Sequence, residues 1–549
     1  MPVRMDPGTA NRQRTLERLS IYAGLAGLAA LLWGLLTSAS APAGAPECQG
    51  NAALASAMPH QGWAPLLVHF SAYASGAEQA GIVRYEWDLD GNGQFDYDAT
   101  AQGGYASYLY SKPGDYAIAL RTTDALGACA TDLVTITVRH PAASSVDYWT
   151  VFDDSQVRRI DVSLSQAEWA RMWEDPEAKY QARADAIIFG EPLNDVGFRM
   201  RGQFSLRASN DKKPFEIDTD AFIDGQEYHN LRRLLLTNSV GDPSLLREKL
   251  AYEAMRYAGV PASHVAFVEL WLDIADDEAP AFFWGVSSLV ERVDNKYLSN
   301  RFGRDSLGGN LYKASHAQRG PMDLVYYGES ISDYPVQNGQ YAYGKMNNED
   351  DADYADIVAL CQAVDGTEYA SEADLVRGLE AAINVDTFLR YLAVITVLDN
   401  FDAYPNTGNN YYLFNNPANG RFEWIPWDLT CCENPRAPLF PTFRGEMMPN
   451  GSPLVEQTLG VTRYRLRYLA YVDLLLREWF TTAHVTDRVQ TYHRLIAPVV
   501  QQATGDKAFY GDQPMFPPEA FASAWQYLVS FTSERNLFLR QALEEVTAP

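Results

Sequence analysis

The chain has 549 residues, of which 47% are hydrophobic and 12% aromatic. This composition excludes a disordered chain, and the length is typical of about two or three domains. The net charge of −26 excludes a nucleic-acid-binding protein, because such proteins present a basic surface to the phosphates. The five cysteines form no Cys-x-x-Cys motif and no paired histidine spacing accompanies them, so no zinc site is predicted.

The first 45 residues follow the order of an export signal. Arginines precede an uncharged run at residues 21–36, and small residues follow at 37–45. The uncharged run has 16 residues, whereas a membrane-spanning helix needs about 20. We therefore prefer a cleaved signal to an uncleaved N-terminal anchor. Either alternative places the remaining chain on the oxidising side of the membrane, where a disulfide between Cys48 and Cys129 is reasonable.

Residues 46–140 contain short β-branched and aromatic runs with turn residues between them. The runs cover residues 66–72, 82–87, 116–121 and 133–138. This spacing predicts a β-sandwich. The segments 62–66 (GWAPL), 85–93 (YEWDLDGNG) and 113–116 (PGDY) resemble the PKD domain. The resemblance implies an immunoglobulin-like module, which a linker at residues 141–146 follows.

The loop at residues 88–96 places carboxylate and amide side chains at alternate positions, together with glycine. Oxygen ligands in that pattern suit Ca²⁺. The D-x-D-G-x-G sequence is also an ordinary PKD turn, and no bidentate glutamate stands at the twelfth position. We prefer the structural turn and keep Ca²⁺ as the alternative.

Residues 147–545 have a mixed α/β pattern with a helical C-terminal part. A strand at 196–202 runs into a glycine-containing loop, and a basic strand follows at 212–217. Kinases cover the phosphates of ATP with such an arrangement, although an ordinary hairpin with a basic rim has the same pattern. Asp242 and Pro243 predict the start of a helix that ends near Tyr257.

The stretch 399–428 has the densest set of candidate site residues. An apolar helical run ends before Asp402, and a Pro/Asn/Gly loop follows it. Two aromatic-rich runs, 411–414 and 422–425, predict a hairpin with Asn410 at its entrance and Asp428 at its exit. Phosphoryl transfer needs one carboxylate to orient the hydroxyl, and an amide and a second carboxylate to hold magnesium. Asp and Asn in loops are also common turn formers, so a purely structural role in turns is the alternative for these residues.

The segments 399–402 (DNFD), 409–413 (NNYYL) and 424–428 (WIPWD) resemble the CotH family, the spore-coat protein H kinases. The resemblance covers about residues 146–543 and implies an α+β, atypical protein-kinase-like fold. It implies that Asp402 is the catalytic aspartate. Asn410 would bind metal, with Asn409 as the alternative, and Asp428 would match the magnesium aspartate of the DFG motif. One departure is Thr430, which stands where family members commonly have a second acid.

The same resemblance implies a nucleotide site. The turn at 201–205 (RGQFS) and the lysines at 212–213 would face the phosphates, and the segment 310–313 (NLYK) would place Lys313 near the nucleotide and Tyr312 against the base. The helix that carries Glu248 would match the kinase αC helix, although we expect Glu248 to be a solvated charge. The implied cofactor-binding residues are Arg201, Gly202, Ser205, Lys213, Glu291, Tyr312 and Lys313.

These resemblances imply an exported kinase that uses ATP with Mg²⁺ or Mn²⁺ to phosphorylate hydroxyl side chains of a surface or extracellular protein. The PKD module would bind a surface polysaccharide or protein, and a membrane would be contacted only through an uncleaved anchor. A catalytically inactive surface or adhesion protein is the main alternative. A polysaccharide-acting enzyme is a third reading, which no closely spaced carboxylate pair supports.

Overall fold

The computed structural model describes residues 48, 53–73, 75, 81–139, 146–207, 212–275, 280–441, 447–502 and 518–547. The predicted export signal and residues 141–145 of the predicted linker lie outside this part of the chain. No helix among the described residues has the length and apolar character needed to cross a membrane. Cys48 and Cys129 are disulfide-bonded, whereas Cys361, Cys431 and Cys432 are free.

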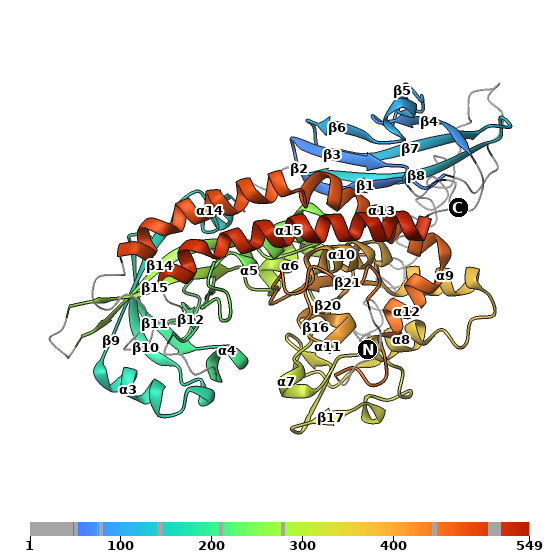
Figure 1. The fold of residues 1–549 in the computed structure, drawn as a ribbon. Coiled ribbons are helices and arrows are strands. Elements are labelled where there is room, and N and C mark those ends of the chain that lie inside the picture. Colours follow the sequence, from blue (N-terminus) through green and yellow to red (C-terminus); the bar gives the residue numbers. More distant parts are fainter. Residues whose placement is uncertain are drawn as a thin grey trace, which may run out of the picture. The chain divides into compact units, whose positions relative to one another are not determined.

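The predicted β-sandwich is present and consists of two sheets (Figure 1). One sheet has the strand order β1-β3-β6 and the other β2-β8-β7-β4-β5. Trp87 is fully buried between the sheets and packs on Phe70. Its indole nitrogen donates a hydrogen bond to the backbone oxygen of Gly104 at 3.1 Å. The strands are β1 Ser56–Met58, β2 Gln61–Trp63, β3 Leu66–Ser71, β4 Ile82–Asp88, β5 Tyr97–Asp98, β6 Ala106–Tyr110, β7 Gly114–Asp124 and β8 Cys129–Arg139.

A closed seven-stranded barrel follows the sandwich. The strand order is β10-β11-β12-β13-β15-β14-β9. Side chains of β10 alternate between buried and exposed, because one face of each strand lines the barrel core. The strands are β9 Arg158–Leu164, β10 Ala182–Ile188, β11 Glu191–Met200, β12 Phe215–Asp218, β13 Arg233–Thr237, β14 Val265–Ile274 and β15 Phe282–Val290. The sequence analysis predicted strands near β11 and β12 but not the closure of the strands into a barrel.

The last part of the chain packs helices around a small sheet. The sheet order is β19-β16-β20-β21, and the predicted hairpin is its β20–β21 pair. Its strands are β16 Leu311–Lys313, β19 Gly344–Lys345, β20 Tyr411–Asn416 and β21 Arg421–Pro426. The principal helices are α5 Arg247–Tyr257, α6 Asn295–Phe302, α8 Ala355–Asp365, α9 Glu372–Ala382, α10 Val385–Leu398, α12 Pro453–Gly460, α13 Thr462–Leu474, α14 Thr482–Gln502 and α15 Pro518–Thr547.

Helix α10 is the central helix of this part. All but one of its residues are buried, which explains its apolar sequence, since a helix that is apolar on every side packs inside the protein. Helices α14 and α15 lie side by side (Figure 1). Short elements complete the fold: α2 Val146–Thr150, α3 Gln166–Glu174, α4 Phe204–Arg207, α7 His316–Arg319, α11 Tyr404–Thr407, β17 Val336–Gln337 and β18 Gln340–Tyr341.

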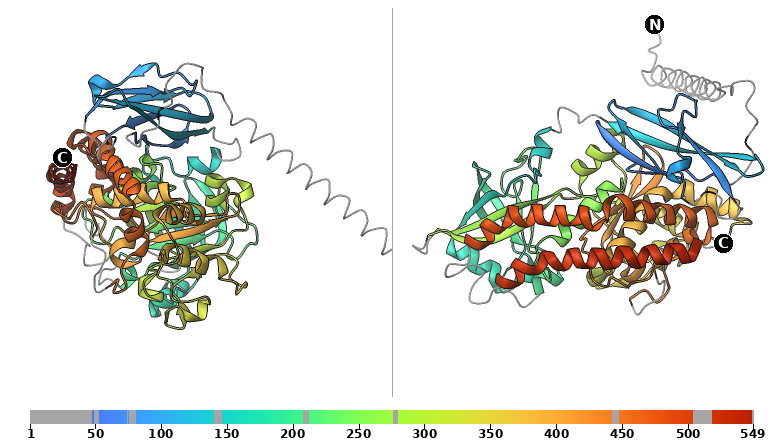
Figure 2. Two further views of the ribbon diagram at one scale, coloured as in Figure 1. Left: turned by 90° about the vertical axis from the view of Figure 1, so that its right-hand side faces the viewer. Right: turned by 45° about the horizontal axis from the view of Figure 1, so that its top comes forward.

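The sandwich is built onto the helices rather than tethered beside them (Figure 2). Strands β1 and β3 contact α13, and Met58 of β1 belongs to the same apolar core as α5 and α10. Arg390 of α10 is fully buried and donates hydrogen bonds to the backbone oxygen of Ala57 at 2.6 Å and to that of Ala258 at 3.2 Å. The hydroxyl of Tyr105 in the sandwich donates a hydrogen bond to the carboxylate of Asp473 in α13 at 2.6 Å. The sandwich therefore contributes to the core of the second domain.

Candidate functional site

The β20–β21 hairpin brings Asn410 and Asp428 to the same end of the small sheet. Tyr411 pairs with Pro426, and the backbone nitrogen of Trp427 donates to the oxygen of Asn410 at 3.0 Å. Asn410 and Asp428 both have left-handed backbone conformations, with φ of 61° and 48°. Asn and Asp tolerate this conformation better than other non-glycine residues. The chain therefore turns away from the strand at both residues and leaves their side chains at the sheet end.

Asp402 lies directly against Asn410. The side-chain nitrogen of Asn410 donates to the carboxylate of Asp402 at 2.8 Å and to its backbone oxygen at 2.9 Å. Thr407 donates to the same carboxylate at 2.8 Å. Asn409 is more distant, at 3.4 Å from both carboxylate oxygens, and its own side-chain oxygen accepts from the backbone nitrogen of His316 at 3.0 Å. Of the two candidate amides, Asn410 is the one held closely against Asp402.

Asp428 has an exposed side chain and no hydrogen bond to its carboxylate among the described residues. The protein atoms around it partly desolvate the carboxylate, and this raises its pKa; Arg201 and Lys313 lower it, and Asp402 raises it again. The backbone nitrogen of Asp428 donates to the hydroxyl of Tyr252 on α5 at 3.0 Å. Two carboxylates and two cations thus share one electrostatic environment.

Lys313 is one of the two cations that lower the pKa of Asp428. It pairs with Tyr412 across β16 and β20, and its amino nitrogen lies 5.4 Å from the Tyr412 ring centre and 5.2 Å from that of Trp427. Desolvation lowers its pKa to about 8; Arg201 also lowers this pKa, and Asp428 raises it. Further cations act on the same lysine, namely Arg292 and Lys179. A chain with a strong negative charge therefore concentrates positive charge beside Asp428.

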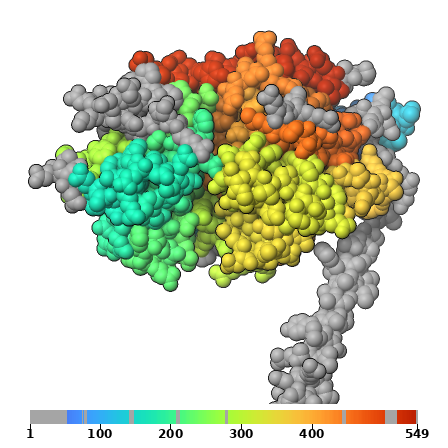
Figure 3. Space-filling model, turned by 90° about the horizontal axis from the view of Figure 1, so that it is seen from below, coloured from blue at the N-terminus to red at the C-terminus, as the bar shows by residue number. Residues whose placement is uncertain are grey.

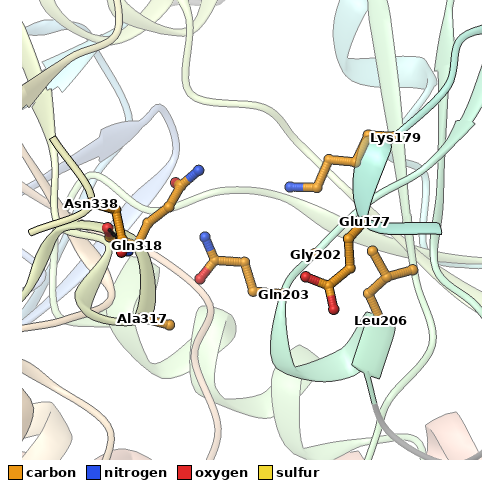
Figure 4. A pocket seen from close by; sticks show the side chains of 8 residues that line it. All are labelled: Glu177, Lys179, Gly202, Gln203, Leu206, Ala317, Gln318 and Asn338. Atoms are coloured by element: carbon orange, nitrogen blue, oxygen red, sulfur yellow. Dashed lines mark hydrogen bonds between the residues drawn. The ribbon is translucent and has the colours of Figure 1, made fainter. Parts of the chain in front are cut away.

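The predicted glycine turn lies beside this cation cluster. Gly202 has φ of +90°, and a Cβ there would lie 2.4 Å from the hydroxyl oxygen of Ser205, so the close turn requires glycine. The turn forms one wall of a pocket of about 140 Å³, and α7 forms the other (Figure 4). Gln203 and Ser315 join the two walls through a 3.5 Å hydrogen bond. The pocket is lined by Glu177, Lys179, Gly202, Gln203, Leu206, Ala317, Gln318 and Asn338.

The pocket lies between two neighbouring parts of the second domain. Figure 3 shows these as adjacent masses, the barrel in teal to green and the part near residues 310–350 in yellow. Figure 4 shows the side chains of Lys179, Gln203 and Gln318 directed into the space between them. The amide and amino groups make this space polar.

The other predicted nucleotide contacts are placed differently. The amino nitrogen of Lys213 donates to the backbone oxygen of Leu206 at 2.9 Å. Glu291 is fully buried and accepts hydrogen bonds from Tyr148 at 2.6 Å and from Arg301 at 2.5 and 2.8 Å. Tyr312 is also fully buried, and its hydroxyl donates to Asp356 at 2.6 Å. Glu291 and Tyr312 are thus held in interior networks and are not brought to Asp428.

Helix α5 supplies two further residues beside Asp428: Glu248, whose surroundings differ from those expected, and Tyr252, which the sequence did not single out. Glu248 accepts a hydrogen bond from the hydroxyl of Thr237 at 2.6 Å, whereas we expected a solvated charge. The pKa of Glu248 is raised to about 7, mainly by desolvation and in smaller part by the charge of Asp428. Tyr252, one helical turn later, contacts the backbone of Asp428. The spacing of four residues between them places both on one helix face, and this was the available signal.

The donor set suits magnesium bound together with phosphate. Asn410 uses its nitrogen toward Asp402, which leaves its side-chain oxygen for a cation, and Asp428 adds an exposed carboxylate. Mg²⁺ typically takes one or two protein carboxylates and completes its shell with phosphates and water. Among the described residues, no group of three His, Cys, Asp or Glu side chains is arranged to hold a metal alone. A substrate phosphate would therefore have to complete the shell.

The loop at 88–96 is a hydrogen-bonded turn. Asp88 accepts from the backbone nitrogens of Gly91 at 2.9 Å, Asn92 at 3.1 Å and Gly93 at 2.7 Å. The side chain that would be the first Ca²⁺ ligand is thus occupied by the backbone, as in an Asx turn.

Two parts of the chain match known protein families. The family model described as CotH kinase protein matches residues 198–539, and that of the PKD domain matches residues 55–138. Comparison with curated proteins gives no match. One similar solved structure comes from work on "the promiscuous specificity of the carbohydrate-binding modules from the beta-sandwich super family". The match has 21% identity and a TM-score of 0.16, and it covers 31% of this chain and 59% of that one. The CotH match spans more than half of the chain, so the protein belongs to the CotH kinase protein family and carries a PKD domain before its kinase-like domain.

Proposed function

We propose that the protein is an exported protein kinase that transfers the γ-phosphate of ATP to hydroxyl side chains of a surface or extracellular protein. The observation that carries the proposal is the direct Asn410–Asp402 hydrogen bond at the sheet end that also holds Asp428. The cations Arg201 and Lys313 also act electrostatically on Asp428. These are the parts that phosphoryl transfer needs: an orienting carboxylate, a metal-binding amide and carboxylate, and phosphate contacts.

Asp402 is the residue that orients the acceptor hydroxyl and accepts its proton. Its carboxylate is fixed by Asn410 and Thr407, so its position does not depend on the substrate. Asn410 and Asp428 would hold Mg²⁺ or Mn²⁺, which supplies neutralisation of the phosphate charge when bound. Arg201 and Lys313 would contact the phosphate oxygens, and the turn at Gly202 would offer backbone N–H groups to them.

The local cations also explain how an acidic protein binds an anionic nucleotide. The net charge of −26 repels ATP at long range. Desolvation is the main cause of the lowered pKa of Lys313, and Arg201, Arg292 and Lys179 lower this pKa further. Such crowding of like charges is costly without an anion, and a bound triphosphate would relieve it.

Export and surface placement complete the proposal. The order of residues 1–45 supports a secreted or cell-surface location, with a cleaved signal or an N-terminal anchor. The PKD domain supports docking to a surface protein or polysaccharide, and Tyr108 and Leu109 of β6 are among its exposed large apolar side chains.

An inactive kinase-fold adhesion protein is the second candidate, and two observations favour it. Thr430 replaces the second acid that relatives commonly have. Glu248 bonds to Thr237, whereas the corresponding glutamate of protein kinases pairs with a lysine.

A phosphotransfer assay with labelled ATP distinguishes the kinase from the inactive adhesion protein. Purified residues 46–549 should be incubated with γ-labelled ATP, Mg²⁺ or Mn²⁺, and generic protein acceptors, beside the Asp402→Ala variant. The kinase proposal expects label on protein with the wild type and none with the variant. Equal background labelling by both, with a folded wild type, would favour the adhesion protein.

A further inference from the structure

Cys431 and Cys432 follow the Asp428 segment directly, and the proposed chemistry does not use them. Both residues are buried. Their sulfur atoms are in contact at 2.6 Å, and Cys432 has a left-handed backbone with φ of 69°. Consecutive buried cysteines whose thiols face each other occupy one apolar site together.

This cysteine pair links the two loops that form the candidate site. The backbone nitrogen of Cys432 donates to the oxygen of Leu398, the last residue of α10, at 2.8 Å. Asp399 follows Leu398 and accepts from the backbone nitrogen of Asn434 at 2.5 Å. The chain that leads to Asp402 is therefore joined, at Cys432 and at Asn434, to the chain that leaves Asp428.

We propose that Cys431 and Cys432 form a vicinal disulfide in the exported protein, and that this bond fixes the segment between Asp428 and the Asp402 loop. Each thiol gives up its proton and a sulfur–sulfur bond forms. The two electrons reduce the disulfide of an oxidised small thiol or of a thiol oxidoreductase to two thiols. Such oxidants are available in extracytoplasmic compartments.

The bond is expected to be easier to reduce than an ordinary structural disulfide. Adjacent Cα atoms are about 3.8 Å apart, whereas disulfide-linked Cα atoms usually lie about 4.4–6.8 Å apart. The shorter spacing strains the bridge and favours its reduction. The disulfide state of the pair could therefore respond to the surroundings while the Cys48 and Cys129 disulfide persists.

Thiol acidity argues against a metal-binding role for the pair. Burial and the neighbouring Cys431 hold the pKa of Cys432 well above its ordinary value. Metals bind the thiolate form, which this environment disfavours. Oxidation to a neutral disulfide removes two buried polar hydrogens and leaves no charge.

Thiol labelling of the exported protein tests the bond. The protein is purified without reductant, unfolded in the presence of N-ethylmaleimide and digested with trypsin. Peptide 422–436 contains Cys431 and Cys432 and no other cysteine, and peptide 346–377 contains only Cys361 and is the internal control. We expect label on Cys361 and none on peptide 422–436, whose mass should be two hydrogens lower. Labelling of peptide 422–436 on one or both cysteines would overturn the proposal.

The effect of the bond on the site rests on the proposed function and has its own test. Mg²⁺-ATP affinity is measured before and after mild reduction for the wild type and for Cys431→Ser. We expect several-fold weaker binding after reduction of the wild type, and reductant-insensitive binding by Cys431→Ser, which also controls for reduction at Cys48 and Cys129. Equal affinity of both wild-type states would refute the coupling. Failure of ATP to bind in any state would refute the proposed function, and the labelling result would stand by itself.

Discussion

Asn410 donates two hydrogen bonds to Asp402, at 2.8 Å to the carboxylate and at 2.9 Å to the backbone oxygen. This contact joins the loop after α10 to the first residue before β20. It fixes the orientation of the Asn410 amide, because its nitrogen is committed to Asp402. The side-chain oxygen is therefore presented away from Asp402, in the direction where a cation would be bound.

Replacement of Asn410 should be far more harmful than replacement of Asn409. Glycine accepts φ of 61° without strain, so Asn410→Gly removes the amide while it keeps the backbone. We expect turnover to fall by at least about 100-fold, as for loss of a metal-positioning group. Asn409→Ala, whose contacts to Asp402 are 3.4 Å long, should lose less than about 10-fold. Similar losses in both variants would contradict this assignment.

The two candidate lysines should differ in nucleotide binding. Lys313 acts on Asp428, whereas Lys213 donates to the backbone of Leu206. Loss of a charge-assisted contact is worth about 1.5–3 kcal/mol, so Lys313→Met should weaken ATP binding by roughly 10- to 100-fold. Lys213→Met should change the affinity by much less. Titration calorimetry with Mg²⁺-ATP gives both values, and a stronger effect at Lys213 would reverse the assignment.

Lys212 should make stability depend on pH above neutrality. Burial lowers its pKa to about 7 in the folded state, against about 10.4 in the unfolded chain. Between these values the unfolded chain binds more protons, so the free energy of unfolding contributed by Lys212 rises with pH, by at most about 1.4 kcal/mol per unit. Urea unfolding at pH 7, 8 and 9 should show this rise for the wild type relative to Lys212→Met. A constant difference between the two would disprove it.

The sandwich and the kinase-like domain should unfold together. Arg390 is buried, pairs with Asp386 at 2.7 Å and binds the backbone of Ala57 in β1. Arg390→Met removes the ion pair with Asp386, whose side chain is 35% exposed, and the hydrogen bond to Ala57, and should cost about 1.5–3 kcal/mol. Calorimetry should show one transition in the wild type, and Arg390→Met should lower the melting temperature of both domains. An independent transition for residues 46–140 would show that the sandwich is merely tethered.

The hairpin and its end residues could be predicted from the sequence, because turn residues and alternating aromatic runs act locally. Asp428 beside Asn410 follows from that pairing alone. Closure of the barrel could not be predicted, since it depends on pairing between β9 and β14, far apart in the sequence. Lys313, in contrast, was placed near the nucleotide by resemblance, and its position beside Tyr412 is a consequence of sheet register.

The differences from the sequence-based expectations concern the burial of polar side chains. Glu291 and Tyr312 have the polarity of ligand-binding residues, but partners distant in sequence, Tyr148 and Asp356, hold them in the interior. Glu248 looked like a surface helix charge, because the sequence does not show which residues pack against that helix face. The residue pattern within one helix or strand indicates its local geometry. The environment of each polar side chain, in contrast, depends on contacts between different helices and strands.

Mg²⁺-ATP binding by Asp428→Asn shows whether the Asp428 carboxylate is a metal ligand. Asn keeps the shape and tolerates φ of 48°, so the fold should persist while the metal carboxylate is lost. Asp399→Asn is the matched control, because Asp399 is also a left-handed aspartate but bonds to the backbone of Asn434. We predict that Asp428→Asn loses Mg²⁺-dependent ATP binding and phosphotransfer, while Asp399→Asn retains both. Wild-type binding and phosphotransfer by Asp428→Asn would contradict it.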